Sequence, residues 1–353
     1  MASIPVHQKA AVVEDPGDNF KILLRNDIPV GEPGPEEILV KLTCTGLCHS
    51  EVRAVLAWGA YKSIIGHEGV GTVVKAGAKV SPSLMGQRVG VKWLYNACTK
   101  CSICQRGLAH NCPNQLNTSR HVPGTLQQYV VADARFITMI PEGLADEIAA
   151  PILCAGLTMS GALAHLDQEL RPGDWIVISG SGGGLGHIGV QIAARIKKLR
   201  VIAIDSGDAK RKLSLDSGAE AFLDFKTEDV VARVLELTGE GAHATIVVPG
   251  TKEAFQMAPS LVRNMATIVN VGLPPNHMDI PISATICAAR GLTIKGSSVG
   301  TESQLTELLN LALGGVITPA IEVFELAETP RLIRQLTEDE IMGRAVVRIP
   351  VDQ

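Results

Sequence analysis

The chain has 353 residues and a formal net charge of −4, with 46% hydrophobic, 19% charged and 3% aromatic residues. This composition excludes a disordered or fibrous protein, and a usual domain size of roughly 150 residues predicts two domains. No basic stripe accompanies the charge, which argues against a nucleic-acid partner.

The N-terminal residues lack a basic segment followed by an apolar one, so we expect a mature, cytoplasmic protein. No apolar run approaches the roughly 18 residues that a membrane-spanning helix needs. Eight cysteines in a chain without an export signal indicate metal binding or catalysis rather than disulfides.

Short strands separated by turns are predicted over the first third of the chain, because β-favouring residues alternate with clusters of Gly and Pro. We therefore expect an irregular all-β barrel or sandwich there. The predicted strands are Lys9–Val13, Lys21–Arg25, Ile38–Leu42, Gly71–Lys75, Arg88–Lys92 and Gln127–Val131.

Cys48, His67 and Cys154 are scattered candidate metal ligands. Two thiolates and one imidazole can hold zinc and leave a fourth position open for a substrate oxygen. Because these residues lie far apart in the sequence, spacing alone does not join them, and each also suits a buried core position. We interpret Cys44 and Cys287 as core residues.

Four further cysteines are clustered as Cys98-x-x-Cys101-x-x-Cys104-x7-Cys112. This spacing is typical of four thiolates that close a tetrahedron around zinc. Such a site has no open position, so we interpret it as structural. An iron–sulfur cluster suits the same spacing and stays an alternative.

The pattern changes near Pro151. Helical spacing is predicted over Gly156–Leu166, and buried strands then alternate with helical segments, which predicts βαβ units and a doubly wound parallel sheet. The predicted strands are Trp175–Ser179, Val201–Asp205, Ala221–Asp224, Thr245–Val248, Ala266–Val271 and Leu292–Lys295, with a last strand at Arg344–Ile349.

A glycine-rich turn follows the strand Trp175–Ser179 and opens a helix, which is the context of a dinucleotide-binding fingerprint. Glycine lets the backbone approach a pyrophosphate whose charge lies at the helix N-terminus. Two registers fit the turn, Gly184-x-Gly186-x-x-Gly189 and one that ends at Gly186.

Asp205 ends the strand that follows this helix. A carboxylate there accepts hydrogen bonds from the adenosine-ribose hydroxyls and repels a 2′-phosphate, which favours NAD over NADP. Lys210 and Arg211 follow closely and weaken this inference.

Together these features resemble the zinc-dependent medium-chain alcohol dehydrogenases, most closely the fungal, yeast-type branch. The resemblance covers essentially the whole chain. It is carried by Gly46-Leu47-Cys48-His49-Ser50-Glu51, Gly66-His67-Glu68-Gly69-Val70-Gly71, Val91-Lys92-Trp93-Leu94, the four-cysteine segment, Gln127-Gln128-Tyr129, Ala150-Pro151-Ile152-Leu153-Cys154-Ala155-Gly156, the glycine-rich turn and Met342-Gly343-Arg344.

The resemblance implies an α/β protein with two domains. These are a GroES-like, β-rich catalytic domain at 1–157, into which 297–353 fold back, and an NAD-binding Rossmann domain at 158–296. Zinc and the substrate are then expected in the cleft between the domains. The resemblance also implies a homotetramer or homodimer that oxidises alcohols, with zinc as Lewis acid and NAD as hydride acceptor.

The resemblance also assigns roles to residues. Cys48, His67 and Cys154 become the ligands of a catalytic zinc, which Glu68 can approach, and the four-cysteine segment binds a second, structural zinc. Ser50 matches the hydroxyl that hydrogen-bonds the alcohol, and Trp93 a wall of the substrate pocket. The implied cofactor contacts are His49, Thr158, Gly183, Gly184, Leu185, Gly186, Asp205, Lys210, Val271, Leu273, Ser298, Val299 and Arg344.

Three departures from the family fall at the substrate side. Arg53 replaces the histidine that ends the family's proton relay, and arginine has no lone pair to accept a proton. Glu51 replaces the usual aspartate beside the zinc-bound histidine. The segment that follows is shorter and contains Trp58 in place of a Trp-rich segment, so we expect a substrate larger or less polar than ethanol.

Two alternatives stay open at this stage. An NADPH-using carbonyl reductase of a biosynthetic pathway would keep the same zinc chemistry. A non-catalytic protein of the same fold is the more distant alternative, since relatives without activity lose zinc ligands or the glycine-rich turn, and both are complete here.

Overall fold

The computed structural model describes residues 4–275 and 278–350. The chain divides into two compact units, the first comprising Met1–Cys154, Thr301–Gly315 and Ile321–Gln353, the second Ala155–Gly300 and Val316–Ala320. Residues 155–157, 297–300 and 316–320, which the resemblance assigned to the catalytic domain, therefore belong to the second unit. One reason is close packing, because Gly161 lies directly against the Val299 carbonyl.

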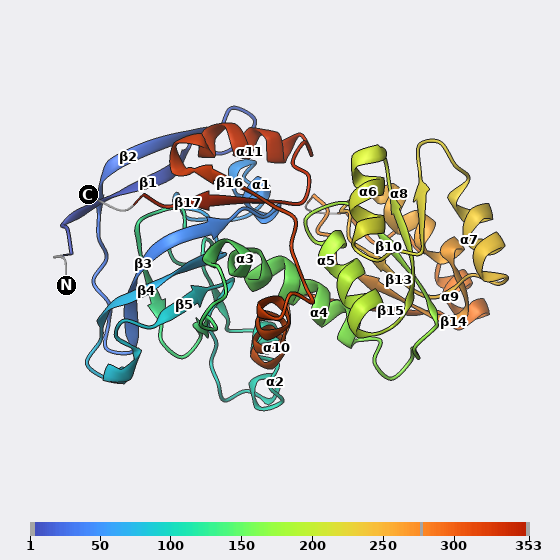
Figure 1. Ribbon diagram of the computed structural model, residues 1–353, viewed down its shortest axis with the longest axis horizontal. Coiled ribbons are helices and arrows are strands. Elements are labelled where there is room, and N and C mark those ends of the chain that lie inside the picture. The colour runs from blue at the N-terminus through green and yellow to red at the C-terminus, as the bar shows by residue number, and fades with distance from the viewer. Residues whose placement is uncertain (1–3, 276–277, 351–353) are drawn as a thin grey trace. The chain divides into compact units, whose positions relative to one another are not determined.

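The first unit is built mainly from antiparallel strands (Figure 1). Its main sheet has the order β16-β17-β3-β4-β5-β9, with β8 also paired to β3, and β1-β2 and β6-β7 form two smaller sheets. The strands are β1 (His7–Glu14), β2 (Lys21–Pro29), β3 (Glu37–Gly46), β4 (Gly69–Ala76), β5 (Arg88–Val91), β6 (Leu94–Asn96), β7 (Leu116–Asn117), β8 (Tyr129–Asp133), β9 (Thr138–Met139), β16 (Ile321–Glu325) and β17 (Arg344–Arg348).

Short helices connect these strands, and α1 (Ser50–Val55) carries Ser50, Glu51 and Arg53. The others are η1 (Pro82–Leu84), α2 (Ser102–Gln105), η2 (Ala109–Asn111), α3 (Asp146–Pro151), α10 (Glu302–Leu313), η6 (Leu326–Glu328) and α11 (Thr329–Thr337). Helices α1, α10 and α11 were not predicted from the sequence, because α1 is too short for a periodic signal and the last 50 residues mix helical and strand patterns.

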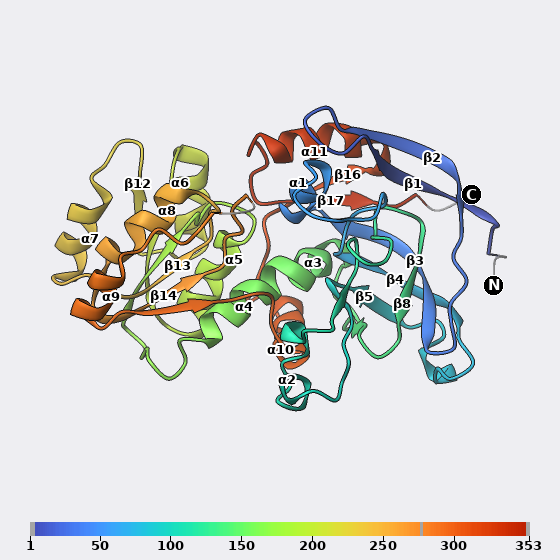
Figure 2. The same ribbon diagram turned by 180° about the vertical axis from the view of Figure 1, so that it is seen from behind.

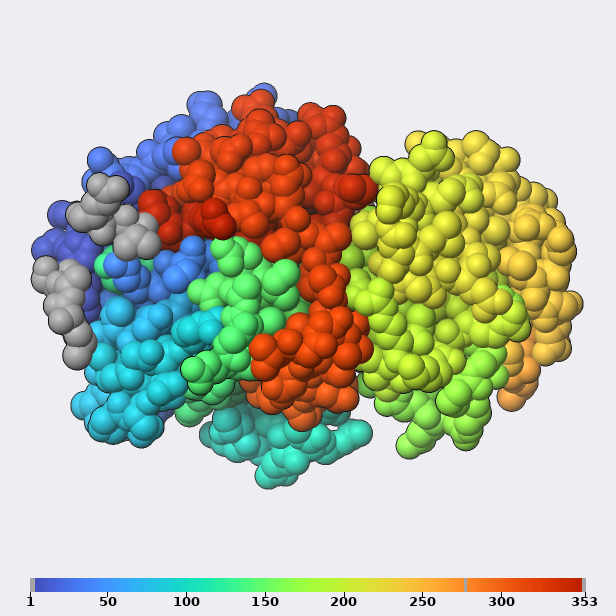
Figure 3. Space-filling model, in the orientation of Figure 1, coloured from blue at the N-terminus to red at the C-terminus, as the bar shows by residue number. Residues whose placement is uncertain are grey.

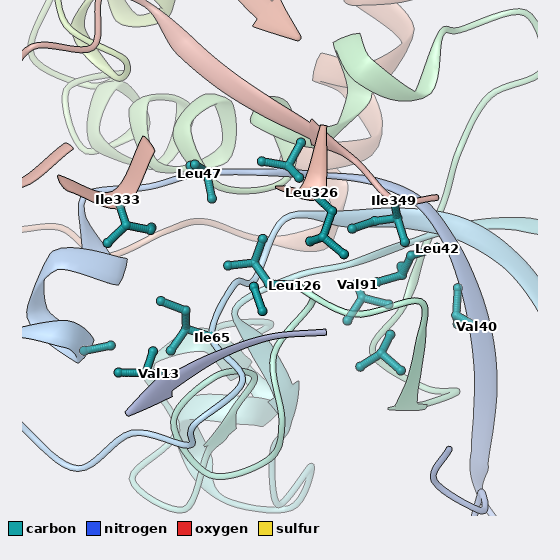
Figure 4. Packing of buried hydrophobic residues seen from close by; sticks show 14 of the residues in the cluster. Val13, Val40, Leu42, Leu47, Ile65, Val91, Leu126, Leu326, Ile333 and Ile349 are labelled. Atoms are coloured by element: carbon teal, nitrogen blue, oxygen red, sulfur yellow. The ribbon is translucent and has the colours of Figure 1, made fainter. Parts of the chain in front are cut away.

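The C-terminal residues complete the core of the first unit. Figure 4 shows Leu326, Ile333 and Ile349 among apolar side chains from the N-terminal part of the chain, such as Val13 and Leu126. In Figure 3 the red C-terminal residues lie beside the blue N-terminal ones on the surface of this unit. Burial of this apolar surface, favourable by roughly 25 cal/mol per Å², holds the C-terminal residues against the first unit.

The second unit contains a parallel sheet of order β12-β11-β10-β13-β14-β15. Helices α5 and α6 cover one face, and α8 and α9 the other (Figure 2). The strands are β10 (Trp175–Ser179), β11 (Arg200–Asp205), β12 (Ala221–Asp224), β13 (Ala242–Val247), β14 (Val262–Asn270) and β15 (Thr293–Gly296), and the helices are α4 (Leu157–Ala164), α5 (Gly186–Gln191), η4 (Ile192–Ile196), α6 (Asp208–Asp216), α7 (Val230–Thr238), α8 (Lys252–Met257), η5 (Ala258–Leu261) and α9 (Ala284–Arg290).

The fold class predicted from the sequence is confirmed, since a β-rich unit accompanies a doubly wound parallel sheet. The strand β10 and the strand β12 have the predicted bounds. The predicted strand Gln127–Val131 begins two residues later, at Tyr129 in β8, because the backbone of Gln127 and Gln128 pairs with β1 at Ala10 and Lys9.

The helical segment around Pro151 begins ten residues earlier than predicted. Helices α3, η3 (Ile152–Gly156) and α4 run on from one another through Asp146–Ala164. Among the described residues this is one helix long and apolar enough to cross a membrane, but 78% of its apolar window is buried inside the protein. Its apolar residues therefore form part of the protein core. The expectation that no apolar run approaches the length of a membrane-spanning helix was wrong for this segment.

Candidate functional site

Cys48, His67, Glu68 and Cys154 meet in the first unit. One ligand atom from each lies within 4.8 Å of all the others, and all four residues are buried. The Sγ atoms of Cys48 and Cys154 are 3.8 Å apart, and Nε2 of His67 is 3.2 Å from Sγ of Cys154. Two thiolates bound tetrahedrally at 2.3 Å from zinc would be about 3.8 Å apart. The donor set and its spacing therefore fit a zinc ion.

Helix α1 holds two of these ligands through Glu51. The Oε2 atom of Glu51 accepts a hydrogen bond from the backbone N–H of Cys48 at 2.6 Å, and Oε1 lies 2.8 Å from Nδ1 of His67. Nδ1 therefore carries the proton, which leaves Nε2 free for a metal. The longer glutamate thus reaches His67 and also fixes the backbone at Cys48.

Glu68 and Arg344 form a buried ion pair beside the ligands, in which Nη2 of Arg344 donates to Oε1 of Glu68. The other carboxylate oxygen, Oε2, is buried without a hydrogen-bond partner among the described residues. Gly46 makes room for it, because a Cβ there would lie 2.0 Å from Oε2. An unpartnered buried carboxylate oxygen next to two thiols also suits a nearby cation.

Charge and burial shift the pKa values of these groups. A hydrogen bond from the Cys154 thiol holds the pKa of the Cys48 thiol well below its usual range. Burial raises the pKa of Glu68 to about 7, against the opposing charge of Arg344. Burial also works to lower the pKa of His67, but the Glu51 carboxylate and the Cys48 thiol together outweigh it and raise that pKa.

Cys154 lies in the π-helical turn η3, between α3 and α4. Single π-turns inside α-helices occur frequently at functional sites. The sequence carried a signal for this irregularity, since Pro151 stands inside the helix one residue before the turn. No spacing rule, however, placed Cys154 beside Cys48, 106 residues away.

Ser50, Arg53 and Trp58, which the sequence predicts at the substrate side, lie on α1 and the loop after it. The Oγ atom of Ser50 is 3.7 Å from Sγ of Cys48. Helix α1 ends in a Schellman motif, with the Trp58 N–H bonded to the Arg53 carbonyl at 2.8 Å and Ala57 in the left-handed region at φ +58°. The Arg53 side chain donates from Nη2 to the Trp58 carbonyl at 3.3 Å, so it also fastens this loop.

Trp93 packs against His67. Its ring meets the ring of His67 edge-on, with centroids 5.2 Å apart and an interplanar angle of 75°. Trp93 is thus in direct contact with the ligand set, whereas Trp58 is half-buried in the loop after α1.

The four-cysteine segment, residues 98–112, forms a second cluster of ligand atoms within 4.8 Å of one another. The Sγ separations are 3.5 Å for Cys98 and Cys112, 3.9 Å for Cys101 and Cys112, and 4.0 Å for Cys98 and Cys104. These values bracket the edge of a zinc–thiolate tetrahedron, and the cysteines form no disulfide. Cys101 also caps α2 by accepting from the Cys104 N–H.

Of the two cysteines expected in the core, one prediction was wrong. Cys44 is 1% exposed within β3. Cys287 is only half-buried, because α9 covers the sheet loosely and buries none of its residues completely.

The glycine-rich turn joins β10 to α5 in the second unit. Gly180 has φ +71°, which favours glycine. A Cβ on Gly186 would lie 2.0 Å from the Gly180 carbonyl oxygen, and one on Gly182 would lie 2.4 Å from Cβ of Lys210. These contacts support the register that ends at Gly186. The glycines therefore leave the backbone of this turn free of side chains, so that a dinucleotide pyrophosphate can approach it closely.

Asp205 is buried at the end of β11 and holds the turn. Its Oδ2 accepts from the Gly182 N–H at 2.9 Å, and its Oδ1 accepts from the Ser206 N–H at 2.9 Å and pairs with Nζ of Lys210 at 3.2 Å. Asp205 and Lys210, both predicted from the sequence as cofactor contacts, thus lie side by side. Arg211 instead forms an ion pair with Glu228.

The other expected cofactor contacts are spread over both units. Thr158 is buried in α4, and Val271 is buried directly after β14. Leu273 is 65% exposed and Ser298 is exposed. Val299 has φ +46°, which is rare for a β-branched residue and marks a functional or strained position. His49 is exposed before α1, whereas Arg344 is buried against Glu68.

Sequence comparison identifies related proteins along nearly the whole chain. Residues 34–142 match the family described as alcohol dehydrogenase GroES-like domain, and residues 184–314 match the family described as zinc-binding dehydrogenase. Alcohol dehydrogenase 2 of Emericella nidulans is 38% identical over 364 residues, covering 98% of this chain and 98% of that protein. The alcohol dehydrogenase of Schizosaccharomyces pombe is 38% identical over 354 residues, covering 98% and 99%.

Solved structures with the same fold agree with these matches. The alcohol dehydrogenase from Aeropyrum pernix has a TM-score of 0.87 at 27% identity, covering 97% of this chain and all of that chain (100%). Acetophenone reductase from Geotrichum candidum, solved in complex with NAD, has a TM-score of 0.86 at 26% identity and covers 98% of both chains.

Proposed function

Since this chain belongs to the zinc-dependent medium-chain alcohol dehydrogenase family, we propose that it interconverts an alcohol larger than ethanol and its aldehyde or ketone, with NAD(H) as the hydride carrier. The enzyme is an oxidoreductase that acts on CH–OH groups of small molecules, and zinc and NAD are its cofactors. The cytoplasmic location and the homotetrameric or homodimeric state expected from the sequence belong to this proposal.

The observation that carries the proposal is the buried cluster of Cys48, His67 and Cys154 beside the unpartnered oxygen of Glu68. Three ligands leave a fourth zinc position for a substrate oxygen, as catalytic zinc sites require. The second cluster, at Cys98, Cys101, Cys104 and Cys112, has four thiolates and no open position, and we assign it to a structural zinc.

When bound, zinc supplies Lewis acidity toward an alcohol or carbonyl oxygen, and the nicotinamide ring accepts or returns a hydride. The chain's own residues prepare that chemistry. Glu51 keeps the His67 proton on Nδ1, so that Nε2 faces the other ligands. Cys48 and Cys154 would supply the negative charge that balances a zinc ion. Glu68 would be a carboxylate able to exchange with substrate at the fourth ligand position of zinc.

Ser50 is placed to bind the substrate hydroxyl and to pass its proton on, because its Oγ lies beside Cys48. Arg53, one helical turn later, has no lone pair that accepts a proton, so the proton leaves through water. Arg53 instead fastens the loop that carries Trp58, and we assign Trp58 and Trp93 to the substrate pocket. These two indole rings offer an apolar surface suited to a substrate larger than ethanol.

Selection of NAD rests on Asp205. The carboxylate is buried at the end of β11 and bonded to the glycine-rich turn, where a 2′-phosphate would meet its negative charge. We assign further cofactor contacts to His49, Thr158, Val271, Leu273, Ser298, Val299, Lys210 and Arg344, and to the turn at Gly183, Gly184, Leu185 and Gly186.

Initial rates with a panel of alcohols and aldehydes test the proposal. With NAD, kcat/KM should be higher for larger primary or secondary alcohols than for ethanol, and NADH should be preferred to NADPH in the reverse direction. A preference for NADPH and carbonyl reduction would favour the carbonyl reductase alternative. A lack of turnover by protein shown to contain zinc would favour a non-catalytic role.

A further inference from the structure

His187 is a fully buried histidine in the first turn of α5, next to the glycine-rich turn, and nothing in the proposed chemistry uses it. Its Nδ1 lies 2.8 Å from the Gly183 carbonyl oxygen. Its Nε2 lies 3.0 Å from the backbone nitrogen of Ala320. The ring therefore connects the turn to a segment more than 130 residues later in the sequence.

The partners decide which nitrogen of the ring carries the proton. A carbonyl oxygen can only accept, so Nδ1 of His187 must donate to Gly183. A backbone N–H can only donate, so Nε2 must accept from Ala320. The two contacts together require the neutral ring with its proton on Nδ1.

The hydrogen bond to Gly183 orients the peptide that follows. The Gly183 carbonyl accepts both from Nδ1 of His187 and from the backbone N–H of His187 at 3.2 Å. A trans peptide directs its C=O and N–H in opposite directions. With the carbonyl held toward His187, the N–H of Gly184 is directed away from α5, to the side where an anion would lie.

One face of the same helix also holds the return segment, Val316–Ala320. Gln191, four residues after His187, accepts from the Thr318 N–H at 2.8 Å and donates to the Thr318 carbonyl at 2.9 Å. Arg195, four residues further, donates to the Val316 carbonyl at 3.1 Å. This spacing places all three side chains on one face of the helix. Of the three, His187 also contacts the glycine-rich turn.

We propose that His187 is a positioning residue for the cofactor, which holds the Gly184 N–H toward the dinucleotide pyrophosphate while the return segment fixes its tautomer. The inference rests on the proposed function, because it takes the glycine-rich turn as the dinucleotide site. It adds a residue outside the turn that sets the affinity of the turn for its anion.

Two substitutions separate the two hydrogen bonds. His187→Gln places an amide oxygen near the position of Nε2, so it keeps an acceptor for Ala320 and loses the donor to Gly183. His187→Asn places an amide nitrogen near the position of Nδ1, so it keeps the donor to Gly183 and loses the acceptor. Gln191→Met is the matched control, since it removes the bonds to Thr318 at similar volume and leaves Gly183 untouched.

The experiment measures the NADH dissociation constant of zinc-loaded protein by fluorescence titration, together with the melting temperature. His187→Gln should raise the dissociation constant by about five- to tenfold, as expected for a lost hydrogen bond, with a melting temperature near that of the wild type. His187→Asn and Gln191→Met should lower the melting temperature and change the dissociation constant by less than about twofold.

Three results would overturn the inference. If His187→Gln binds NADH as tightly as the wild type, the Gly183 bond does not position the turn. If all three variants weaken binding in proportion to their loss of melting temperature, His187 is only structural. If the wild type itself binds neither NADH nor NADPH, the proposed function fails and the inference falls with it.

Discussion

At the scale of single residues, Glu51 shows how one side chain serves two ligands. Its two oxygens bond the Cys48 N–H and Nδ1 of His67, so one carboxylate sets both the backbone and the imidazole. From the sequence, Glu51 is only a longer residue in place of the usual aspartate. The structure shows that the extra methylene group is absorbed without losing the contact to His67.

We expect Glu51→Gln to weaken zinc binding at the catalytic site by about 10- to 100-fold, because the amide is uncharged and only its oxygen can accept. Zinc content after dialysis against a graded series of chelator concentrations measures this. Glu68→Gln is the comparison, since it changes a neighbouring carboxylate that bonds neither Cys48 nor the His67 ring. Unchanged zinc retention in Glu51→Gln would contradict the role given to this residue.

Asp205 also has two tasks at the residue scale, charge and hydrogen bonding. Asp205→Asn keeps an oxygen for the Gly182 N–H and removes the charge that opposes a 2′-phosphate. We expect the ratio of kcat/KM for NAD over NADP to fall by about tenfold or more. Asp205→Leu should in addition weaken NAD itself, because it leaves the Gly182 N–H without this acceptor. An enzyme that already prefers NADP before substitution would refute the assignment.

At the scale of elements, the two cysteine clusters differ in how the chain builds them. The segment 98–112 collects four ligands from one short stretch, whereas the other cluster takes its ligands from a turn before α1, the two residues directly before β4 and a π-turn. A local cluster stabilises its own loop when it binds metal, and a dispersed one depends on the whole unit being folded.

This difference predicts opposite effects for two substitutions. Each of Cys104→Ser and Cys154→Ser should reduce the zinc content from two ions per chain to one, as measured by elemental analysis. Cys104→Ser should chiefly lower the melting temperature, since structural zinc contributes folding free energy, and Cys154→Ser should chiefly lower kcat. One zinc or none in the wild type, or the reverse pattern in the variants, would show the assignment to be wrong.

The Schellman motif that ends α1 gives a second prediction for an element. Ala57 has φ +58°, a conformation that costs an alanine roughly 1–2 kcal/mol, while glycine adds entropy to the unfolded chain. Ala57→Gly should therefore raise the free energy of unfolding by about 0.5–1 kcal/mol. Ala54→Gly, inside the same helix, should lower it by about 1 kcal/mol. Chemical denaturation of both variants checks the signs, and a loss of stability in Ala57→Gly would contradict the motif.

At the scale of the whole molecule, buried carboxylates set the response to acid. Burial works to raise the pKa of Asp133, but hydrogen bonds from Arg135 and Asn96 outweigh it and hold that pKa below its usual value of 3.8. The folded state therefore binds fewer protons here than the unfolded state. The stability that Asp133 contributes is fully present above pH 4 and is lost as the pH falls through the lowered pKa.

We accordingly expect Asp133→Asn to reduce the free energy of unfolding near pH 7 and to flatten its decline between about pH 4 and pH 2. Urea denaturation at a series of pH values measures both effects. Asp27→Asn is a suitable control, because this carboxylate also pairs with an arginine but lies exposed on β2, where screening leaves little net stabilisation. An acid limb identical to that of the wild type would contradict the contribution of Asp133.

The sequence alone determined those features that depend on residues close together in the chain. Strand β10, the glycine-rich turn and the four-cysteine segment each follow from the residue types and spacings within about fifteen positions. The family resemblance then added the proposed ligands of the catalytic zinc, which spacing could not join. Local signals are sufficient to predict these features, because hydrophobic periodicity, turns that require glycine and metal-ligand spacing each involve residues close together in the sequence.

The tertiary structure decided every contact between distant residues. The bond of Glu68 to Arg344 spans 276 positions, and the bonds of Gln191 to Thr318 span 127. His187 lies within the predicted glycine-rich motif, yet its partner at Ala320 depends on where the return segment lies. Such pairs are set by how sheets and helices pack, and packing is a property of the whole fold rather than of any sequence window.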